Sequence, residues 1–203
     1  MINKFPLIGV GAIALVGKDT FFKIFSDILK EHNIECERVA LADQLKSEAD
    51  QFCKEKYGIS AFTKNPKEKE IIRDFFVTHG KIMRNLSKGA YWTSKLQPIV
   101  DNYRQENKLV ICTDIRYSEF ECDEINWLKD KNKGIYIHIN RFKQDGSKFL
   151  PINSDEAKNE KLLRNKADFT LNWMTSDDQN YLIDTIKLQL KDLLKNICPN
   201  YQY

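Results

Sequence analysis

Residues 6–29 constrain the fold most, because the period of their apolar residues changes at one point. The apolar run at 7–16 is too short to span a membrane, and it ends at the turn Gly-Lys-Asp-Thr, 17–20. After the turn, apolar residues recur at helical spacing, at positions 21, 22, 24, 25, 28 and 29. We therefore expect a strand, a tight turn and a helix, an arrangement in which the backbone N–H groups at the helix start bind phosphate.

The turn matches the phosphate-loop pattern G-x-x-x-x-G-K-[ST] in part. Gly17 and Lys18 fit, and a lysine at this point reaches the terminal phosphates of a nucleotide. Ala12 stands at the first glycine position, and Asp19 stands where a magnesium-binding hydroxyl is usual, with Thr20 one place later. Three further positions make the loop more apolar than usual: Ile13, Leu15 and Val16. A capped helix after a strand fits the same residues, so the rest of the chain must decide.

The composition narrows the class of protein. With 203 residues, of which 42% are hydrophobic, the chain has enough apolar material for one α/β domain. A net charge of +3 is too small for a dedicated nucleic-acid-binding protein. The five cysteines lack zinc-like spacing and suit a reducing compartment. No segment has the pattern of a transmembrane helix or a signal peptide. We therefore expect a cytoplasmic protein with a small-molecule partner and no membrane contact.

Along the rest of the chain, short apolar runs typical of strands alternate with segments whose apolar residues recur at helical spacing. Further strands are predicted at 35–42, 108–113, 135–140 and 168–173. Helices are predicted at 43–57, 66–86 with an interruption at Gly80, 90–106 with a kink or restart at Pro98, 118–131 and 177–198. Asp43 is the expected N-cap of the first of these helices, and Gly58 ends it. Residues 141–160 show no sustained period and are predicted to form a long loop. This order predicts an α/β fold with a mostly parallel five-stranded sheet.

Three polar segments follow predicted strands, and ligands of parallel sheets bind at the carboxyl ends of the strands. These segments contain Lys18, the pair Asp114 and Arg116, and Arg141. Asp114 can hold magnesium, directly or through water, or accept a proton from the acceptor. The structural alternative for Asp114 is a helix cap or an ion pair with Arg116.

Basic residues elsewhere are candidates for binding phosphate. Arg73 and Arg84 are eleven residues apart, so an unbroken helix would carry both on one face, about 16 Å apart. They could meet one phosphate only if Gly80 bends the helix. After the fourth strand, Arg141, Lys143 and Lys148 could form a basic loop that closes over a nucleotide and excludes water. A solvated surface is the alternative interpretation for both groups.

Seven short segments then follow one another in a recognisable order. They are GKDT at 17–20, LADQLK at 41–46, IIRDFFVTHGKIMRN at 71–85, YWTSKL at 91–96, TDIRYSEFE at 113–121, IHINR at 137–141 and ADFTLNW at 167–173. Together they span nearly the whole chain. In this order they resemble the phage-type deoxynucleoside monophosphate kinases, within the P-loop nucleoside and nucleotide kinase superfamily.

The resemblance implies a three-layer P-loop NTPase-like fold and one kinase domain over 1–203. Within it, 43–106 would be a helical monophosphate-binding part and 141–160 a lid-like loop. The implied reaction transfers the γ-phosphate of ATP to a deoxynucleoside 5′-monophosphate, with Mg²⁺.

The implied ATP-binding residues are Ala14, Val16, Gly17, Lys18, Asp19, Thr20 and Arg141. The implied substrate-binding residues are Lys46, Arg73, Arg84, Trp92, Asp114 and Arg116. The implied catalytic residues are Lys18, Asp114, Arg116 and Arg141. Thr20 and Asp114 would hold the metal.

The chain departs from the family pattern in two places. The loop lacks the usual glycine at Ala12 and is apolar where the family is polar or basic. The family places an acidic residue six positions after the aspartate that corresponds to Asp114. Here that position is Phe120, between Glu119 and Glu121, so neither glutamate is assigned.

Three other functions remain open. The outline also resembles animal-type phosphomevalonate kinases and the P-loop kinases that phosphorylate hydroxymethyluracil in phage DNA. Aromatic residues such as Phe75 and Trp92 favour a nucleotide acceptor, and the small net charge argues against DNA. A degenerate P-loop protein that binds a nucleotide or a partner without catalysis fits the apolar loop, whereas the retained Lys18 and Asp114 argue against it. If the chain is phage-encoded, its location is the host cytoplasm. Dimerisation, the base and the sugar stay open.

Overall fold

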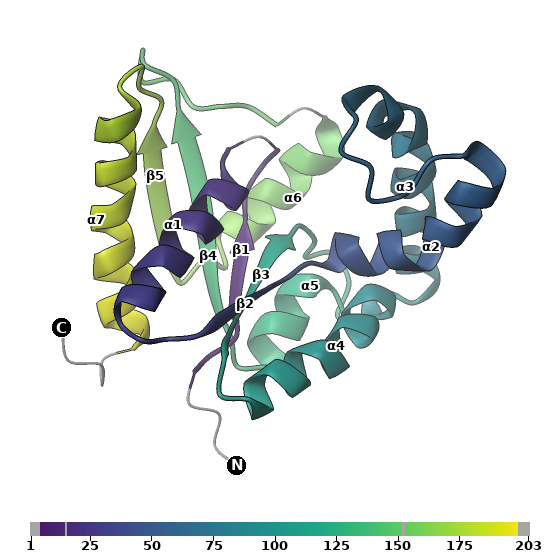
Figure 1. The fold of residues 1–203 in the computed structure, drawn as a ribbon, viewed down its shortest axis with the longest axis horizontal. Coiled ribbons are helices and arrows are strands. Elements are labelled where there is room, and N and C mark those ends of the chain that lie inside the picture. The colour runs from purple at the N-terminus through teal and green to yellow at the C-terminus, as the bar shows by residue number, and fades with distance from the viewer. Residues whose placement is uncertain (1–4, 15, 152, 199–203) are drawn as a thin grey trace.

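Within the residues that the computed structural model describes (5–14, 16–151 and 153–198), five strands form one sheet, and every pair of neighbouring strands is parallel. The order is β2-β3-β1-β4-β5 (Figure 1). The strands are β1 (Ile8–Gly11), β2 (Cys36–Val39), β3 (Leu109–Ile115), β4 (Ile135–Phe142) and β5 (Phe169–Met174). The predicted α/β fold with a parallel five-stranded sheet is confirmed.

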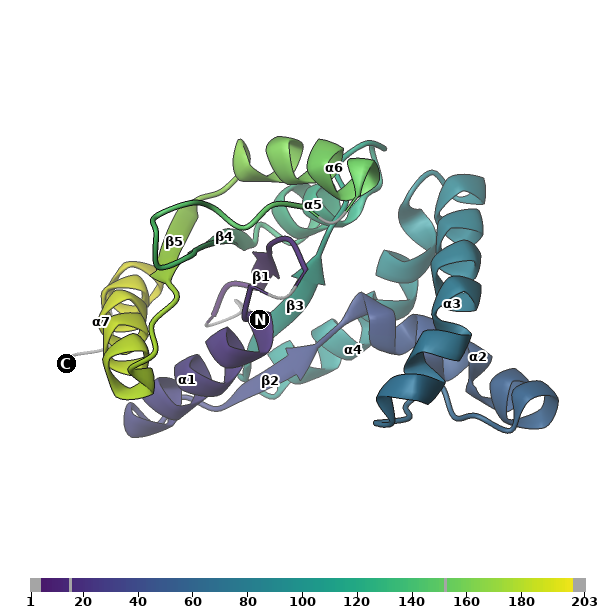
Figure 2. The same ribbon diagram turned by 90° about the horizontal axis from the view of Figure 1, so that it is seen from above.

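Helices cover both faces of the sheet, which gives three layers (Figure 2). One face carries α1 (Lys18–Glu31) and α7 (Gln179–Ile197). The other carries α4 (Ala90–Gln105), the short α5 (Glu124–Asn126) with the π-helical turn η1 (Trp127–Lys131), and α6 (Ser154–Arg164). Beside the sheet, α3 (Pro66–Leu86) packs on α2 (Leu41–Tyr57) and α4. Across the described ranges, no helix has both the length and the apolarity that a bilayer span requires.

The central strands are buried on both faces, which explains their continuous apolar runs. Along β3, Leu109 and Ile111 pack under α1 and α7, while Val110 and Cys112 face the cluster that includes α4. The alternation of side chains along a strand produces this division. The two cores hold the sheet rigid, so the loops at its carboxyl edge start from fixed points.

The prediction that Gly80 interrupts its helix is wrong, because α3 runs unbroken over Pro66–Leu86. A Cβ atom on Gly80 would lie 3.3 Å from the Leu45 side chain of α2. The Gly80 carbonyl accepts a hydrogen bond from the Trp92 indole of α4 at 3.2 Å. Gly80 therefore serves the close packing of helices. Likewise, α4 continues through Pro98 and does not restart there.

The predicted helix over 118–131 is wrong for its first part, 118–123, and right in being helical over 124–131. Only α5 is α-helical, followed by the π-helical turn η1. The carboxylate of Asp123 accepts hydrogen bonds from the backbone N–H groups of Glu119 and Phe120, both at 2.7 Å. Such local side-chain bonds satisfy backbone donors without a helix. The segment after β3 is consequently an irregular loop held by carboxylates.

The segment 141–160 is shorter as a loop than predicted, because β4 extends to Phe142 and α6 begins at Ser154. The Asn153 side chain accepts a hydrogen bond from the Glu156 N–H at 2.8 Å and so caps α6. An asparagine followed three residues later by glutamate is a recognisable helix start. This pattern was present in the sequence, and the helix could have been predicted from it.

Candidate active site

The carboxyl ends of three strands meet at one edge of the sheet. β1 lies between β3 and β4, and its last residue, Gly11, is in register with Ile115 of β3 and His138 of β4. Lys18 follows β1 and Arg116 follows β3, whereas Arg141, which was predicted to follow its strand, lies within β4 one residue before its end at Phe142. The segments that carry Lys18 and Arg116 therefore start from neighbouring strands.

Two glycines shape the loop between β1 and α1. Gly17, at the start of α1, has a φ of 104°, and a Cβ atom on it would lie 3.0 Å from the ring of Trp173. A side chain there would be both strained and crowded. At Gly11 a Cβ atom would lie 2.2 Å from the Tyr136 hydroxyl, so this glycine lets β1 pack on its neighbours. Leu15 lies outside the described residues.

The apolar side chains of the loop belong to the core. Ile13 and Val16 are buried in the cluster between the sheet and the α1–α7 layer. Only the backbone of Val16 is therefore free to meet a ligand at this point. The departure from a polar loop sequence has a structural cause: these side chains anchor the loop.

Lys18 folds back over the loop. Its ammonium group donates hydrogen bonds to the carbonyl oxygens of Ala12 at 3.2 Å and Ile13 at 3.0 Å. The loop also offers a donor, since the Ala14 N–H donates to the Glu156 carboxylate of α6 at 2.7 Å. A glutamate 142 residues away in the sequence thus binds the loop backbone. Glu156 was missed by the sequence analysis.

Four charged residues act on Lys18. Burial and, after it, the positive charge of Arg116 lower the pKa of Lys18 to about 8, against the opposing negative charges of Glu156, Asp114 and Asp19. Lys18 and the pair Asp114 and Arg116, which the sequence places on two different segments, therefore lie within electrostatic reach of one another. At neutral pH Lys18 keeps its positive charge.

Asp114 caps a helix. Its two carboxylate oxygens accept hydrogen bonds from the N–H groups of Leu41 and Ala42, both at 2.8 Å, at the start of α2. The prediction that Asp43 is the N-cap of α2 is wrong, because the helix begins two residues earlier and Asp43 pairs with Arg38 at 3.0 Å. The structural alternative for Asp114, a helix cap, is thus realised, although the helix belongs to another segment.

Thr20 and Asp114 are the residues expected to hold Mg²⁺. Among the described residues, no group of three or more His, Cys, Asp or Glu side chains is arranged as a metal site. Kinase sites, however, typically bind Mg²⁺ through one or two protein ligands plus water and substrate phosphates. Thr20 is exposed in the first turn of α1. The Oδ2 atom of Asp114 accepts one hydrogen bond and retains a further lone pair, whereas Oδ1 accepts from both the Leu41 N–H and the Cys112 thiol. This donor set fits a sparsely ligated magnesium ion.

A buried glutamate fixes the turn that carries Arg116. One carboxylate oxygen of Glu124 accepts the N–H groups of Arg116 and Tyr117. The Arg116 side chain itself is exposed at the edge of the sheet. Burial, followed by the negative charge of Asp114, raises the pKa of Glu124 from 4.5 to about 8. Sequence analysis did not identify Glu124.

We expect Glu124→Gln to change how stability depends on pH. Because the pKa is higher in the folded protein than in the unfolded chain, the folded state loses about 1.4 kcal/mol per pH unit as pH rises from about 4.5 to about 8. The loss stops above the folded pKa. Glutamine does not titrate, so the variant should gain stability relative to wild type between pH 5 and pH 8 in urea denaturation. An equal difference at both pH values would contradict the shifted pKa.

Arg84 joins α3 to the loop after β3. It is buried and donates two hydrogen bonds to Asp123, at 2.9 and 2.7 Å, and one to Glu119 at 2.9 Å. Its guanidinium lies 4.0 Å from the ring centroid of Tyr117 and 4.7 Å from that of Phe120. All of these contacts are structural. A substrate phosphate would therefore have to share Arg84 with two carboxylates.

The other predicted substrate residues lie on the helical part formed by α2, α3 and α4. Arg73 is exposed on α3, and because the helix is unbroken it lies about 16 Å along the axis from Arg84. Lys46 is partly exposed beside the Phe62 ring. Trp92 is buried and packs among other rings. The two arginines thus contact different groups.

The aromatic residues of this part pack on one another. Phe75 stacks on Phe52 and on His79, with ring centroids 5.5 and 5.8 Å apart. Glu48 accepts hydrogen bonds from His79 and Tyr91, and Lys95 also bonds to it. These bonds outweigh desolvation and lower the pKa of Glu48 to about 2. Phe52 remains 43% exposed at the end of the stack, where a planar ring can approach.

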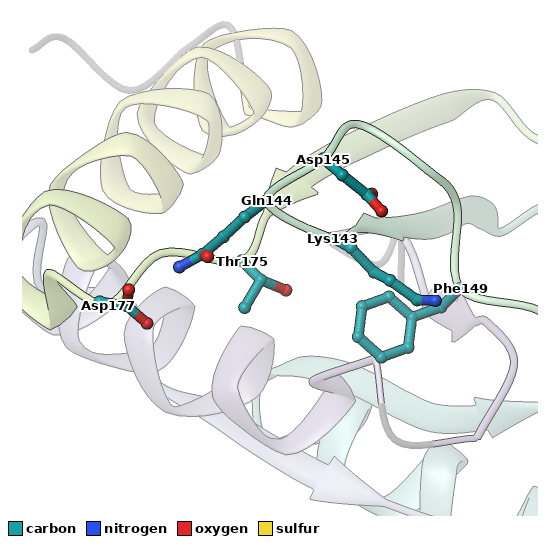
Figure 3. Close-up of a pocket in the computed structure, with 6 residues that line it drawn as sticks. All are labelled: Lys143, Gln144, Asp145, Phe149, Thr175 and Asp177. Atoms are coloured by element: carbon teal, nitrogen blue, oxygen red, sulfur yellow. The ribbon is translucent and has the colours of Figure 1, made fainter.

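An open pocket of about 430 Å³ lies near Arg141 (Figure 3). It is lined by Lys143, Gln144, Asp145, Phe149, Thr175 and Asp177. The Arg141 guanidinium donates to the Thr175 hydroxyl at 3.2 Å and lies 5.4 Å from the Phe149 ring centroid. Volumes of 300–1,000 Å³ are typical of small-molecule sites. Of the lining residues, only Lys143 was a sequence candidate.

No protein-family model and no curated protein matches the chain. Among solved structures, a gluconokinase from Sinorhizobium meliloti 1021 has a TM-score of 0.39 and 10% identity, covering 98% of this chain and 99% of that chain. A shikimate kinase from Acinetobacter baumannii, in complex with shikimate, has a TM-score of 0.40 and 12% identity, with coverage of 99% and 97%. At these scores the likeness carries no argument about substrate or activity.

Proposed function

We propose that the chain is an ATP-dependent kinase that transfers the γ-phosphate to a deoxynucleoside 5′-monophosphate. The observation that carries the proposal is the anion-binding arrangement at the β1–α1 loop. There the Ala14 N–H binds a carboxylate oxygen at 2.7 Å, next to the buried ammonium of Lys18. Phosphate oxygens are recognised by the same donors.

The loop and the pocket together would bind the donor nucleotide. Its phosphates would bind the loop amides and Lys18, and its base would enter the pocket beside Phe149. Arg141, held by Thr175 and lying near the Phe149 ring, would then lie between base and phosphates. A planar base suits an aromatic wall. The polar residues at the rim, such as Lys143 and Asp177, can bond to its edge.

Transfer of a phosphoryl group requires positive charge and alignment more than covalent chemistry. Lys18 supplies one charge at the loop, and Arg116 supplies another from the neighbouring strand end. Glu124 and Asp123 hold the turn that orients Arg116. A magnesium ion bound by Thr20 and Asp114 would supply further charge neutralisation to the phosphates.

The acceptor would bind against α3. Arg73, Lys81 and Arg84 share one face of this helix by their spacing. Lys81 lies 3.5 Å from Asp155 of α6, and Arg84 reaches the loop after β3. That face consequently looks toward the donor site. Cations along it suit the phosphate of an acceptor.

The proposal is tested by ADP production from ATP and Mg²⁺, with each acceptor offered separately. The acceptors are the four deoxynucleoside monophosphates, the ribonucleotides, phosphomevalonate and DNA that contains hydroxymethyluracil. We expect turnover with one or more deoxynucleotides. Turnover with phosphomevalonate alone, or only with DNA containing hydroxymethyluracil, would replace the proposed acceptor. Nucleotide binding without any turnover would favour a non-catalytic P-loop protein.

A further inference from the structure

The first turn of α6 places a carboxylate on the phosphate-binding loop. Glu156 accepts the Ala14 N–H at 2.7 Å, and its negative charge acts on Lys18. The backbone of Glu156 is itself fixed by the Asn153 cap at the helix start. The carboxylate is thus held against an amide and beside an ammonium group, the two kinds of donor that bind a phosphate.

A carboxylate and a phosphate cannot use these donors at the same time. Each offers a negatively charged oxygen with similar hydrogen-bond geometry, and like charges at this distance repel. A triphosphate that enters the loop must therefore either displace Glu156 or bind beside an uncompensated negative charge.

From this arrangement we propose that Glu156 is a built-in competitor of the donor nucleotide, so that the first turn of α6 leaves the loop when a polyphosphate binds. The inference rests on the proposed function, because it takes the loop as the site of the donor phosphates. It makes the chain self-inhibited at low nucleotide concentration and couples nucleotide binding to a movement of α6.

The contacts of α6 differ between its two ends. The first turns are held by ion pairs on the surface, Asp155 with Lys81 at 3.5 Å and Lys158 with Glu119. Exposed ion pairs contribute little stability. Toward the other end, Leu163 is buried in the core, and Glu160 approaches the buried His138 at 3.5 Å. The first turn can therefore separate from the loop while the end of α6 stays in place.

The test measures the affinity of inorganic tripolyphosphate and of ATP, each without acceptor, by calorimetry at pH 7. The proteins are wild type, Glu156→Gln, Glu156→Ala and Asp155→Asn. The last variant removes the same charge from the adjacent position, where the side chain faces Lys81 and not the loop. It is the matched control for a general change in electrostatic potential.

We expect both Glu156 variants to bind tripolyphosphate and ATP roughly tenfold more tightly, the factor that the loss of one charge-assisted hydrogen bond and its repulsion corresponds to. Asp155→Asn should stay within about twofold of wild type. In hydrogen exchange, the Ala14 amide of wild type should be protected by Glu156 when no ligand is present. It should be protected by a phosphate oxygen when polyphosphate is bound.

The outcomes separate this inference from the proposed function. If wild type turns over nucleotide but the Glu156 variants bind no more tightly, or more weakly, the competitor role is wrong and the kinase stands. Tighter polyphosphate binding without any phosphoryl transfer supports the competitor role and contradicts the kinase. If no variant binds tripolyphosphate or ATP, the loop is not a phosphate site and both are wrong. An equal gain in Asp155→Asn would show a non-specific charge effect and overturn the inference.

Discussion

Replacing Lys18 by alanine should lower the rate of phosphoryl transfer roughly 10²- to 10³-fold, the usual loss when one preorganised donor to the transition state is removed. The ammonium group is a positive charge that bonds to the loop itself, and burial strengthens its effect on a phosphate oxygen. The fold should remain intact, because within the described part of the chain the group bonds to carbonyls of its own loop, those of Ala12 and Ile13. Circular dichroism and the thermal midpoint should match wild type.

The matched control is Lys23→Ala, which removes an exposed lysine from the same helix. This variant should keep the activity of wild type. Near-wild-type turnover by Lys18→Ala would mean that the β1–α1 loop does not hold the transferred phosphate, whatever the acceptor.

Replacing Asp123 by alanine should destabilise the fold by roughly 3–5 kcal/mol, because it leaves the buried guanidinium of Arg84 without its two-bond partner. The same change frees the backbone N–H groups of Glu119 and Phe120. The measurement is urea denaturation at neutral pH. Asp74→Ala, at an exposed position of α3, is the control and should change stability by less than about 0.5 kcal/mol.

The double variant Arg84→Met with Asp123→Leu removes both charges of the ion pair and leaves apolar side chains in their place. Removing both charges avoids an unpaired buried ion, so the double variant should be more stable than Asp123→Ala alone. If Asp123→Ala costs no more than the Asp74 control, Arg84 is not held in this way in solution and is free to bind a substrate phosphate.

The sheet could be predicted from the sequence because its information is local. Strand β3 is a continuous apolar run, since both of its faces are buried, and the strand-turn-helix at Lys18 shows a clear change of period. The same locality explains the end of α2 at Gly58, which has a positive φ of 66°. The period of the apolar residues and the position of a glycine are sufficient to predict these elements.

The loop after β3 could not be predicted in this way. Its residues have a helical pattern, but the side chains of Asp123 and Glu124 accept hydrogen bonds from four backbone N–H groups and hold the chain from Arg116 to Phe120 in an irregular loop. Nor does the sequence around Asp114 indicate that it caps α2, since its partners Leu41 and Ala42 are more than seventy residues away. Such contacts depend on the assembled sheet.

Some residues of the candidate site could likewise be predicted from the local sequence, and others could not. Lys18 and Arg116 are found from their places after strands, and the structure brings them within electrostatic reach of each other. Glu156 was missed because its contact with Ala14 spans 142 residues and its helix was predicted as loop. Recognising the Asn153 cap would have given the helix, but not its partner.

The most direct test of the central claim follows the phosphate itself. ATP with a radiolabelled γ-phosphate is incubated with Mg²⁺, the protein and each deoxynucleoside 5′-monophosphate, and the products are separated by chromatography. We predict that the label appears in a deoxynucleoside diphosphate, only when its monophosphate is present, and not with Lys18→Ala. Label that stays in ATP, or appears only as inorganic phosphate with every acceptor, would contradict a nucleotide kinase.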